Sequence, residues 1–325
     1  MSKYLITGIT GFAGPHLANL LYSEGHEIHG LIRNSNGREN DIRDVVQDDV
    51  FKNIIFHYSD LSNKKLIDNI LKENQFDGVF HLAAQSHPPT SFIDPVGTFN
   101  ENIINSANLI SAISDFQDNC KLMFCSTSEV YGNQGSDGRE IHWDTKLTPS
   151  NPYGVSKASI DIFMQERMEN NYINGFITRA FSHTGPRRGR NFSISSDAFQ
   201  LARINKGMQD NILSIGNLET TRVVIDVRDT VNAYYMLMIN DDSSGKIFNV
   251  CGDTPRKMEF FTDTLINISG LDVEKKVSDD LYRPIDIMYQ NGDASNLIDI
   301  TDWKPNIAIE ETLSDLLDYW NKKIN

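Results

Sequence analysis

Short apolar runs alternate with longer amphipathic stretches through the first half of the chain. The apolar runs predict strands at 4–6, 26–32, 54–58, 78–82 and 121–125. Between them, apolar residues recur at helical spacing and predict helices at 13–24, 63–74, 98–115 and 153–171. Strands that alternate with helices of this length form βαβ units. The pattern therefore predicts an α/β fold with a Rossmann-type, doubly wound parallel sheet that binds ligands at the carboxyl ends of its strands.

The pattern changes after about residue 180. Residues 182–195 read as an arginine-rich loop, and further elements are predicted as a helix at 195–207, strands at 212–215 and 222–226, and a turn at 216–217. A helix near 228–240 and a strand at 246–250 are expected to return to the main sheet, and the chain closes with a helix at 309–322. We therefore expect a dinucleotide-binding domain at 1–180, rejoined by 217–250, and a smaller C-terminal substrate lobe formed by 181–216 and 251–325. Because no flexible linker is visible, the two parts should share one cleft.

Composition narrows the functional classes. The 325 residues carry a formal charge of −14, from 30 basic and 44 acidic side chains, which argues against nucleic acid or an anionic membrane as a partner. The three cysteines, Cys120, Cys125 and Cys251, form no close pair, so neither a metal site nor a disulfide framework is expected. No apolar run is long enough to span a membrane, and residues 1–7 lead directly into a folded motif. The expected location is the cytoplasm.

A glycine-rich loop follows the first predicted strand and opens the first predicted helix. Gly8 permits a tight turn, Gly11 lets the backbone approach a pyrophosphate, and Gly14 lets the helix pack closely. The start of the helix offers unpaired N–H groups and a partial positive charge to phosphates. The spacing alone is weak, but the strand–turn–helix context predicts a dinucleotide cofactor.

The end of the second strand bears on which dinucleotide is bound. A carboxylate there would bind the ribose 2′-hydroxyl of NAD, whereas this chain has Arg33, with Arg38 close behind. An arginine can pair with a 2′-phosphate, which favours NADP and leaves NAD possible; the alternative is a solvated loop arginine. Asp60 and Leu61, after the third strand, are placed to meet the adenine, although Asp60 could instead cap a helix.

Tyr153 and Lys157 lie four residues apart in a predicted helix and so share one face. A nearby ammonium stabilises a phenolate, so we expect Lys157 to lower the pKa of Tyr153 toward the range of a general base. Thr127, at the end of the fifth strand, would share the substrate proton with the phenol. Tyr and Lys at this spacing are common by chance, and it is the combination with the glycine-rich loop that predicts catalysis.

These motifs together resemble the extended short-chain dehydrogenase/reductase superfamily, over essentially the whole chain. The resemblance rests on Gly8/Gly11/Gly14, Asp60-Leu61, 81–84, 126–132 and Tyr153/Lys157. Within that superfamily the chain is similar to the GDP-mannose 4,6-dehydratases at 29–33, 57–62, 84–87, 91–92, 186–189, 216–218, 282–284, 292–293 and 303–305. The last three segments are also typical of the related GDP-4-keto-6-deoxymannose reductases.

The resemblance implies an NADP-dependent 4,6-dehydratase acting on a GDP-hexose, with GDP-mannose as the leading substrate. Tyr153 would take the 4-hydroxyl proton while C4 gives up hydride, and Glu129 would remove the C5 proton as water leaves C6; hydride then returns to C6. The implied catalytic residues are Thr127, Glu129, Tyr153 and Lys157. The implied cofactor contacts, besides the three glycines, are Thr10, Phe12, Ala13, Arg33, Asp60, Leu61, Leu82, Ala83, Ala84, Ser86, Tyr153, Lys157, His183 and Arg188.

The resemblance also assigns residues to the nucleotide-sugar. The implied substrate contacts are Ser86, His87, Ser128, Ser182, Arg222 and Arg283, the two arginines being suited to the diphosphate and the nucleotide. The smaller lobe would thus bind the nucleotide-sugar. The superfamily commonly pairs subunits through the helix that carries Tyr153, and the 187–190 loop is typical of tetramers, so a homodimer or homotetramer is implied.

Several departures from the dehydratase pattern keep alternatives open. Ser182 replaces an asparagine, 192–197 lacks a lysine and looks more like the reductases, Gly97 replaces a tyrosine, Asn105 replaces a glycine, and Pro88-Pro89 follows His87. These departures leave the identity of the hexose open, so GDP-N-acetylglucosamine and a GDP-heptose remain alternatives to GDP-mannose. A GDP-4-keto-6-deoxy-sugar reductase or epimerase of the same fold is the alternative activity. A noncatalytic NADP-binding protein is disfavoured because Tyr153 and Lys157 are both retained.

Overall fold

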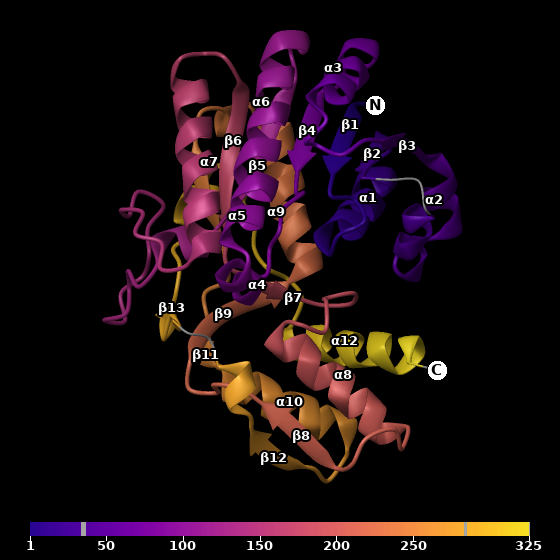
Figure 1. The fold of residues 1–325 in the computed structure, drawn as a ribbon, viewed down its shortest axis with the longest axis vertical. Helices are drawn as coiled ribbons and strands as arrows, with labels where there is room; N and C mark the ends of the chain where they lie inside the picture. The colour runs from indigo at the N-terminus through magenta and orange to yellow at the C-terminus, as the bar shows by residue number, and fades with distance from the viewer. Residues whose placement is uncertain (34–36, 283–284, 325) are drawn as a thin grey trace.

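A seven-stranded parallel sheet forms the centre of the larger part of the molecule (Figure 1). The computed structural model describes residues 1–33, 37–282 and 285–324. The strand order is β10-β6-β5-β4-β1-β2-β3. The strands are β1 (Lys3–Thr7), β2 (Glu27–Ile32), β3 (Ile54–Tyr58), β4 (Gly78–His81), β5 (Lys121–Thr127), β6 (Asn174–Ala180) and β10 (Ile247–Val250). This confirms the predicted α/β class and the doubly wound, Rossmann-type sheet.

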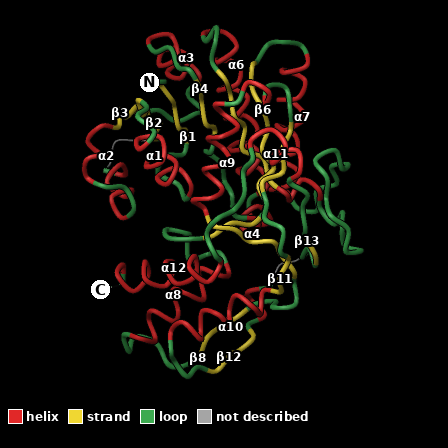
Figure 2. The backbone as a smooth tube through the Cα atoms, turned by 180° about the vertical axis from the view of Figure 1, so that it is seen from behind, coloured by secondary structure: helices red, strands yellow, loops and turns green. Residues whose placement is uncertain are grey.

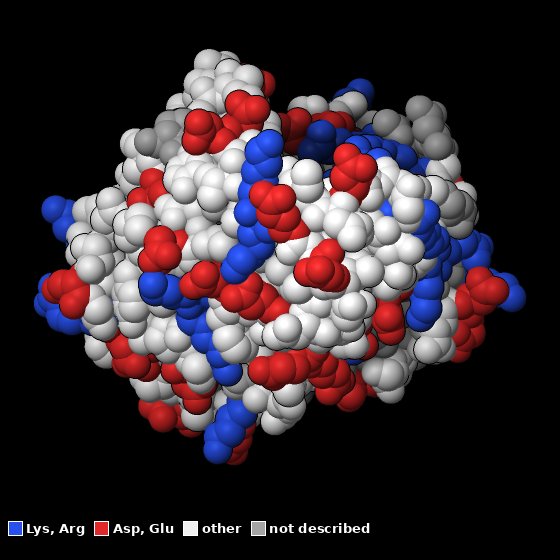
Figure 3. Space-filling view, turned by 90° about the horizontal axis from the view of Figure 1, so that it is seen from below, with Lys and Arg blue, Asp and Glu red and all other residues white. Residues whose placement is uncertain are grey.

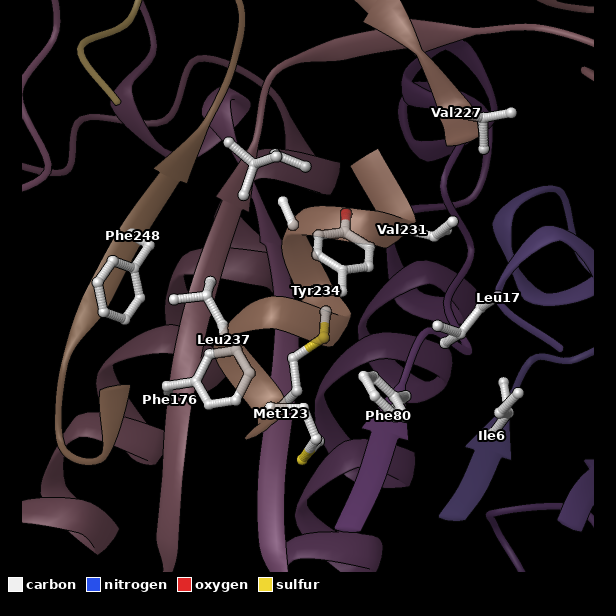
Figure 4. Packing of buried hydrophobic residues seen from close by; sticks show 14 of the residues in the cluster. Ile6, Leu17, Phe80, Met123, Phe176, Val227, Val231, Tyr234, Leu237 and Phe248 are labelled. Atoms are coloured by element: carbon white, nitrogen blue, oxygen red, sulfur yellow. The ribbon is translucent and has the colours of Figure 1, made fainter. Parts of the chain in front are cut away.

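Alternate residues of each strand face opposite sides of the sheet, and both sides are covered. In β1, Tyr4 and Ile6 enter one apolar core while Leu5 enters the other. The first core lies under α1 (Ala13–Ser23) and α9 (Val227–Ile239), and Figure 4 shows Tyr234 and Leu237 of α9 among the residues packed over the strands. The second core lies under α3 (Lys64–Glu73), α6 (Asn105–Phe116) and α7 (Pro152–Glu169). Burial on both faces explains why these strands read as continuous apolar runs.

The predicted helix at 98–115 is confirmed as helical throughout, but it starts earlier, at Pro95, and a π-helical turn interrupts its α-helical hydrogen bonding. The structure has α4 (Pro88–Ile93), α5 (Pro95–Phe99), a π-helix η2 (Asn100–Ile104) and then α6. Pro88 and Pro95 each begin a helix, since proline is accommodated in the first turn but not in a helix interior. Strand β6 was not predicted, although its 7 residues form the longest run of pairs with β5.

The C-terminal part forms smaller sheets and its own helical layer below the ends of the main strands (Figures 1 and 2). A four-stranded sheet joins β11 (Pro255–Lys257), β9 (Thr221–Asp226), β13 (Tyr289–Gln290) and β7 (Ser182–Thr184), and β12 (Glu274–Val277) pairs with β8 (Ile212–Ile215). The helices of this layer are α8 (Ser193–Asn205), α10 (Met258–Ser269) and α12 (Ile309–Lys323). Helix α11 (Ser295–Thr301) instead packs against β10 and α9 of the larger part, and α2 (Asp48–Asn53) lies beside α1. Short helical turns are η1 (Arg38–Asp44), η3 (Ser128–Tyr131), η4 (Asp241–Ser243) and η5 (Asp279–Leu281).

The expected return of 217–250 to the main sheet is only partly right. β10 pairs with β6 and α9 packs on the main sheet, but β9 lies in the four-stranded sheet. The alternation of apolar residues in β9 predicts a strand without showing which partner it pairs with, since pairing is fixed by tertiary contacts. The remaining domain boundaries stay a prediction.

Acidic and basic side chains are interspersed on the lower face of the molecule, as Figure 3 shows. No helix in the described ranges is both long enough and apolar enough to cross a bilayer. The cysteines of those ranges form no disulfide; Cys120 and Cys251 are buried and Cys125 is half-buried.

Candidate active site

A large cavity of about 1090 Å³ opens at the carboxyl ends of the main strands and extends into the C-terminal part. The last residues of β1, β2, β5 and β6 line it, namely Thr7, Ile32, Thr127 and Ala180. Residues of α8, β8, β9 and α10 line its other end. The structure thus gathers the two groups of residues that the sequence assigned to a cofactor and to a substrate.

The glycine-rich loop forms one wall of the cavity. Gly8 has φ +74°, and a Cβ on it would lie 2.8 Å from the backbone nitrogen of Ala83. A Cβ on Gly14 would lie 2.6 Å from the Gly8 carbonyl oxygen, which is the close packing expected at this position. By contrast, a Cβ on Gly11 would meet one described atom, the Gly8 oxygen at 3.0 Å. The space above Gly11 is therefore open toward the cavity.

Helix α1 starts at this loop without a side-chain cap. Phe12 occupies the N-cap position and accepts no hydrogen bond through its side chain from the first turn of the helix. The first N–H groups of α1 are thus left for another acceptor, and a phosphate is the anion that such helix starts commonly bind. Thr10, Phe12, Ala13, Leu82, Ala83, Ala84 and Ser86 also line the cavity. The open wall and the uncapped helix fit a dinucleotide.

Arg187 fixes the glycine-rich loop by binding its backbone carbonyl groups. Its guanidinium donates to the carbonyl oxygens of Thr10 and Gly11, each at 3.0 Å, and pairs with Asp44 at 2.5 Å. Asp44 also accepts hydrogen bonds from Tyr319 at 2.8 Å and Lys323 at 3.2 Å, both in α12. A loop, a short helical turn and the last helix are thereby fixed around the cofactor wall.

The adenine end of the predicted cofactor site is lined by Arg33, Arg38, Asp60 and Leu61. Arg33 forms an ion pair with Glu101 at 2.6 Å, and half of its side chain is exposed. Asp60 accepts a hydrogen bond from the backbone N–H of Ser62 at 2.8 Å, and hydrogen bonds with Ser62 contribute to holding its pKa below the ordinary value. The alternative role of Asp60 as a helix cap is wrong, because Asn63 caps α3.

A hydroxyl, a carboxylate and a phenol meet where β5 ends and α7 begins. Thr127, Glu129 and Tyr153 line the same stretch of cavity, and Thr127 is hydrogen-bonded to the Tyr153 phenol. Glu129 accepts a hydrogen bond from the side-chain amide of Asn151 at 2.7 Å. The carbonyl oxygen of the same Asn151 amide accepts from the backbone N–H of Gly154 at 2.7 Å and caps α7. One asparagine therefore fixes both the helix that carries Tyr153 and the carboxylate opposite it.

The pKa of Tyr153 runs opposite to the expectation from its spacing to Lys157. Burial raises the pKa of Tyr153 well above its ordinary value, and the hydrogen bond with Thr127 and the charge of Arg188 offset only part of that rise. Burial likewise lowers the pKa of Lys157, whose ammonium lies 4.4 Å from the centre of the Phe124 ring. The expected lowering was wrong for the protein itself, because enclosing the phenol removes the water that would solvate a phenolate.

Arg188 lies inside an aromatic cage. Its guanidinium is 3.4 Å from the centre of the Phe192 ring and 4.8 Å from that of Phe12, and burial lowers its pKa to about 10. Phe12 also stacks on His183 at 5.7 Å between ring centres. The pKa of His183 is lowered to about 4 by burial, so this ring is neutral at pH 7. Both residues line the cavity beside Tyr153 and Ser182, where they could reach a cofactor or a substrate.

The predicted substrate residues are brought together except for one outside the described residues, Arg283. Ser86, His87, Ser128, Ser182 and Arg222 all line the cavity. Ser128 is buried and donates to Gln290 at 3.1 Å, so its hydroxyl is already engaged. His87 bridges Thr90 and the carbonyl of Asn191, and Arg222 pairs with Asp286 at 3.4 Å.

Sequence reasoning missed several residues of this site. Asn151, Arg187, Asp197 and Gln290 were given no role, although Asn151 directly precedes a proline at the start of α7 and so carried a recognisable capping signal. The other three become significant only through contacts with residues far away in the chain. No local pattern identifies such contacts.

The family model described as GDP-mannose 4,6 dehydratase matches residues 5–316. The chain is 27% identical over 322 residues to the GDP-6-deoxy-D-mannose reductase of Pseudomonas aeruginosa, covering 99% of this chain and 98% of that protein. It is 30% identical over 348 aligned positions to the GDP-mannose 4,6 dehydratase of Cricetulus griseus, covering 96% and 90%. Its structure is similar to that of RMD from Pseudomonas aeruginosa complexed with NADPH, with a TM-score of 0.83, 26% identity and full coverage of both chains.

Proposed function

Because the chain belongs to the GDP-mannose 4,6-dehydratase family, we propose that it is a nicotinamide-dependent enzyme that dehydrates a GDP-hexose to a GDP-4-keto-6-deoxyhexose. GDP-mannose is the leading substrate. The observation that carries the proposal is the placement of a carboxylate, Glu129, in the same cavity wall as the Thr127–Tyr153 pair. A sugar oxidation alone requires the phenol, whereas elimination of water requires a second base.

The glycine-rich loop and the uncapped start of α1 would hold the pyrophosphate of the cofactor, and Arg33 is positioned for a 2′-phosphate, which favours NADP. The NADPH complex of the related Pseudomonas aeruginosa protein supports the same choice. Arg33 would have to exchange Glu101 for that phosphate, an exchange that costs little at an exposed ion pair. When bound, the oxidised cofactor supplies a hydride acceptor whose ring carries a positive charge.

The protein's own groups then move protons. Tyr153 accepts the proton of the 4-hydroxyl, with Thr127 hydrogen-bonded to the same phenol oxygen, as C4 becomes a ketone. The ketone acidifies C5, and Glu129 takes the C5 proton while the C6 hydroxyl leaves; this proton passes to the leaving hydroxyl to form water. The hydride taken from C4 would return to C6, and the proton held by Tyr153 would make up the one lost from C5, so that the conversion involves no net redox change. Burial of Tyr153 means that its phenolate depends on nearby positive charge, which Arg188 provides in part.

Incubation of the purified protein with GDP-mannose, catalytic NADP⁺ and no external reductant tests the activity. A 4-keto product formed in excess over the cofactor is expected, because the hydride returns to the substrate in each cycle. Glu129→Gln should still bind cofactor but lose elimination by roughly a hundredfold or more. Near-normal dehydration by that variant would exclude Glu129 as the C5 base.

A GDP-4-keto-6-deoxy-sugar reductase or epimerase is the second candidate. The full-length similarity to the Pseudomonas aeruginosa reductase favours it, together with Ser182 and the lysine-free 192–197 segment. Turnover of the keto sugar alone, with stoichiometric NADPH, would support this reading over dehydration. Replacing GDP-mannose by GDP-N-acetylglucosamine or a GDP-heptose in the same assay would identify a different hexose.

We propose a homodimer or homotetramer that pairs through α7 and its neighbouring helices. Exposed apolar residues on these helices support pairing there: Ile104, Val155 and Ile162 are 53%, 39% and 57% exposed. Light scattering during size-exclusion chromatography, repeated with Ile162→Glu, tests the proposal. The cytoplasmic location stays a prediction.

A further inference from the structure

Asp197 is a buried carboxylate in the part of the cavity that is lined by C-terminal elements, at the opposite end from the glycine-rich loop. It lies in the second turn of α8, is 5% exposed, and lines the cavity wall. α8 packs against α10 in the C-terminal part, which Figure 1 shows below the main sheet. The proposed proton transfers do not use this residue.

Asp197 is poorly compensated within the protein. Its Oδ2 accepts a hydrogen bond from the Thr262 hydroxyl at 2.7 Å, and its Oδ1 accepts none from a described residue. No cation among the described residues pairs with it. Burial raises the pKa of Asp197 to about 7, and the hydrogen bond from Thr262 offsets only part of that rise. A buried carboxylate with one neutral donor is costly, because the other lone pairs lose water without gaining a partner. Such a group in a cavity wall is suited to a ligand that brings its own N–H donors.

The surroundings of Asp197 favour a flat, mostly apolar ligand group. The same end of the cavity is lined by one apolar cluster, Ile194, Ile215, Leu218 and Met258, with Ser193, Ser196, Ser214 and Asn217 between them. Apolar walls with a few placed polar groups are typical of a site that encloses a heterocycle and recognises its edge.

The pattern of donors on the ligand can be specified. A carboxylate accepts two parallel hydrogen bonds, and guanine offers two adjacent N–H groups, from N1 and the 2-amino group. Uracil offers one N–H between two carbonyls, and adenine offers only its amino group beside ring acceptors. Resting on the GDP-sugar substrate proposed above, we propose that Asp197 is a specificity-determining residue that binds the N1 and 2-amino edge of the guanine base.

Titration calorimetry with free nucleoside diphosphates tests this assignment without turnover. Wild-type protein should bind GDP roughly tenfold or more tightly than IDP, which lacks the 2-amino group, and than UDP. Asp197→Asn is nearly isosteric but presents one acceptor and one donor. This variant should lose GDP affinity by roughly tenfold or more and should bind xanthosine 5′-diphosphate more tightly than GDP, since xanthine carries a carbonyl in place of the 2-amino group.

Asp286→Asn is the matched control, being the same substitution on another carboxylate of the cavity, one that pairs with Arg222. It should leave the order of the bases unchanged whatever it does to diphosphate binding. Equal weakening of all four nucleotides by Asp197→Asn would overturn the base-reading role and indicate a structural or ribose contact. Wild-type preference for GDP with no change in the variant would overturn the role of Asp197 alone. Equal wild-type affinity for UDP and GDP would overturn the proposed GDP-sugar substrate as well.

Discussion

Polar side chains at the two ends of the cavity differ in how fully the protein satisfies their hydrogen bonds. At the ends of the main strands, the side chains that would change protonation are held by the protein: Glu129 by Asn151, and Tyr153 by Thr127. At the C-terminal end, Asp197 has the Thr262 hydroxyl as its one partner among the described residues. Fixed partners suit a place where bonds change, because reacting groups need a single geometry. An under-satisfied acceptor suits a place where a ligand completes the hydrogen bonding.

The largest effect should follow from removing the phenol at the fixed end. Tyr153→Phe should lower kcat for the nucleotide-sugar by about a thousandfold, because the proton acceptor is lost while the ring still fills its buried place. Steady-state kinetics and GDP titration check this together. GDP affinity should stay within about twofold of wild type, and a comparable loss of binding would mean that the two ends are not independent.

A second difference lies in the response of stability to pH at the C-terminal end. The pKa of Asp197 is raised to about 7 from 3.8, so between these values the folded state holds a proton that the unfolded state releases. Its contribution therefore destabilises the fold as pH rises from 5 to 8, by about 2 kcal/mol. Asp197→Asn should remove this dependence, so urea unfolding should find the variant gaining stability relative to wild type from pH 5 to pH 8. A constant difference would contradict the assignment.

The buried histidines should make stability respond to pH with the opposite sign. Burial lowers the pKa of His81 from 6.5 to about 3, and those of His57 and His183 to about 4. The unfolded state binds protons first as pH falls below 6.5, so the free energy of unfolding should drop by about 1.5 kcal/mol from His81 alone between pH 6.5 and 5. Urea unfolding of Asp197→Asn isolates this trend, and an unchanged free energy over that interval would show that these rings are not buried as described.

The smallest effect concerns the residue that joins helix α7 to Glu129. Asn151→Ala removes both the helix cap and the amide donor and should cost about 1 kcal/mol of stability. Asn151→Ser retains a capping oxygen, so its melting temperature should stay near wild type while kcat still falls severalfold with KM unchanged. If serine restored kcat as well, the contact with Glu129 would have no role in positioning that carboxylate.

Local sequence signals were sufficient for the larger sheet and for the glycine-rich loop. Five main strands, the loop at 8–14 and the pairing of Tyr153 with Thr127 in one cavity follow from apolar runs, glycine spacing and helical periodicity. The strands and the loop depend on neighbours in sequence, whereas Thr127 and Tyr153 are brought together by the fold.

What the sequence could not provide depends on long-range contacts and on burial. The place of β9 in a second sheet, the ion pair of Arg187 with Asp44 and the isolation of Asp197 each require the folded arrangement. The pKa of Tyr153 was predicted in the wrong direction for the same reason. Spacing reveals the nearby lysine, whereas the loss of solvent around the phenol is a property of the whole enclosure.

The link from Tyr319 and Lys323 through Asp44 to Arg187 has a consequence for biosynthesis. The glycine-rich loop leaves the ribosome long before the helix that secures its support, because residues 8–14 precede α12 by most of the described chain. At about 5–20 residues per second, the loop waits tens of seconds for that helix. A nascent chain should therefore bind a dinucleotide at full strength only once α12 has emerged and packed, and a ribosome stalled before α12 should display a folded sheet that retains cofactor weakly.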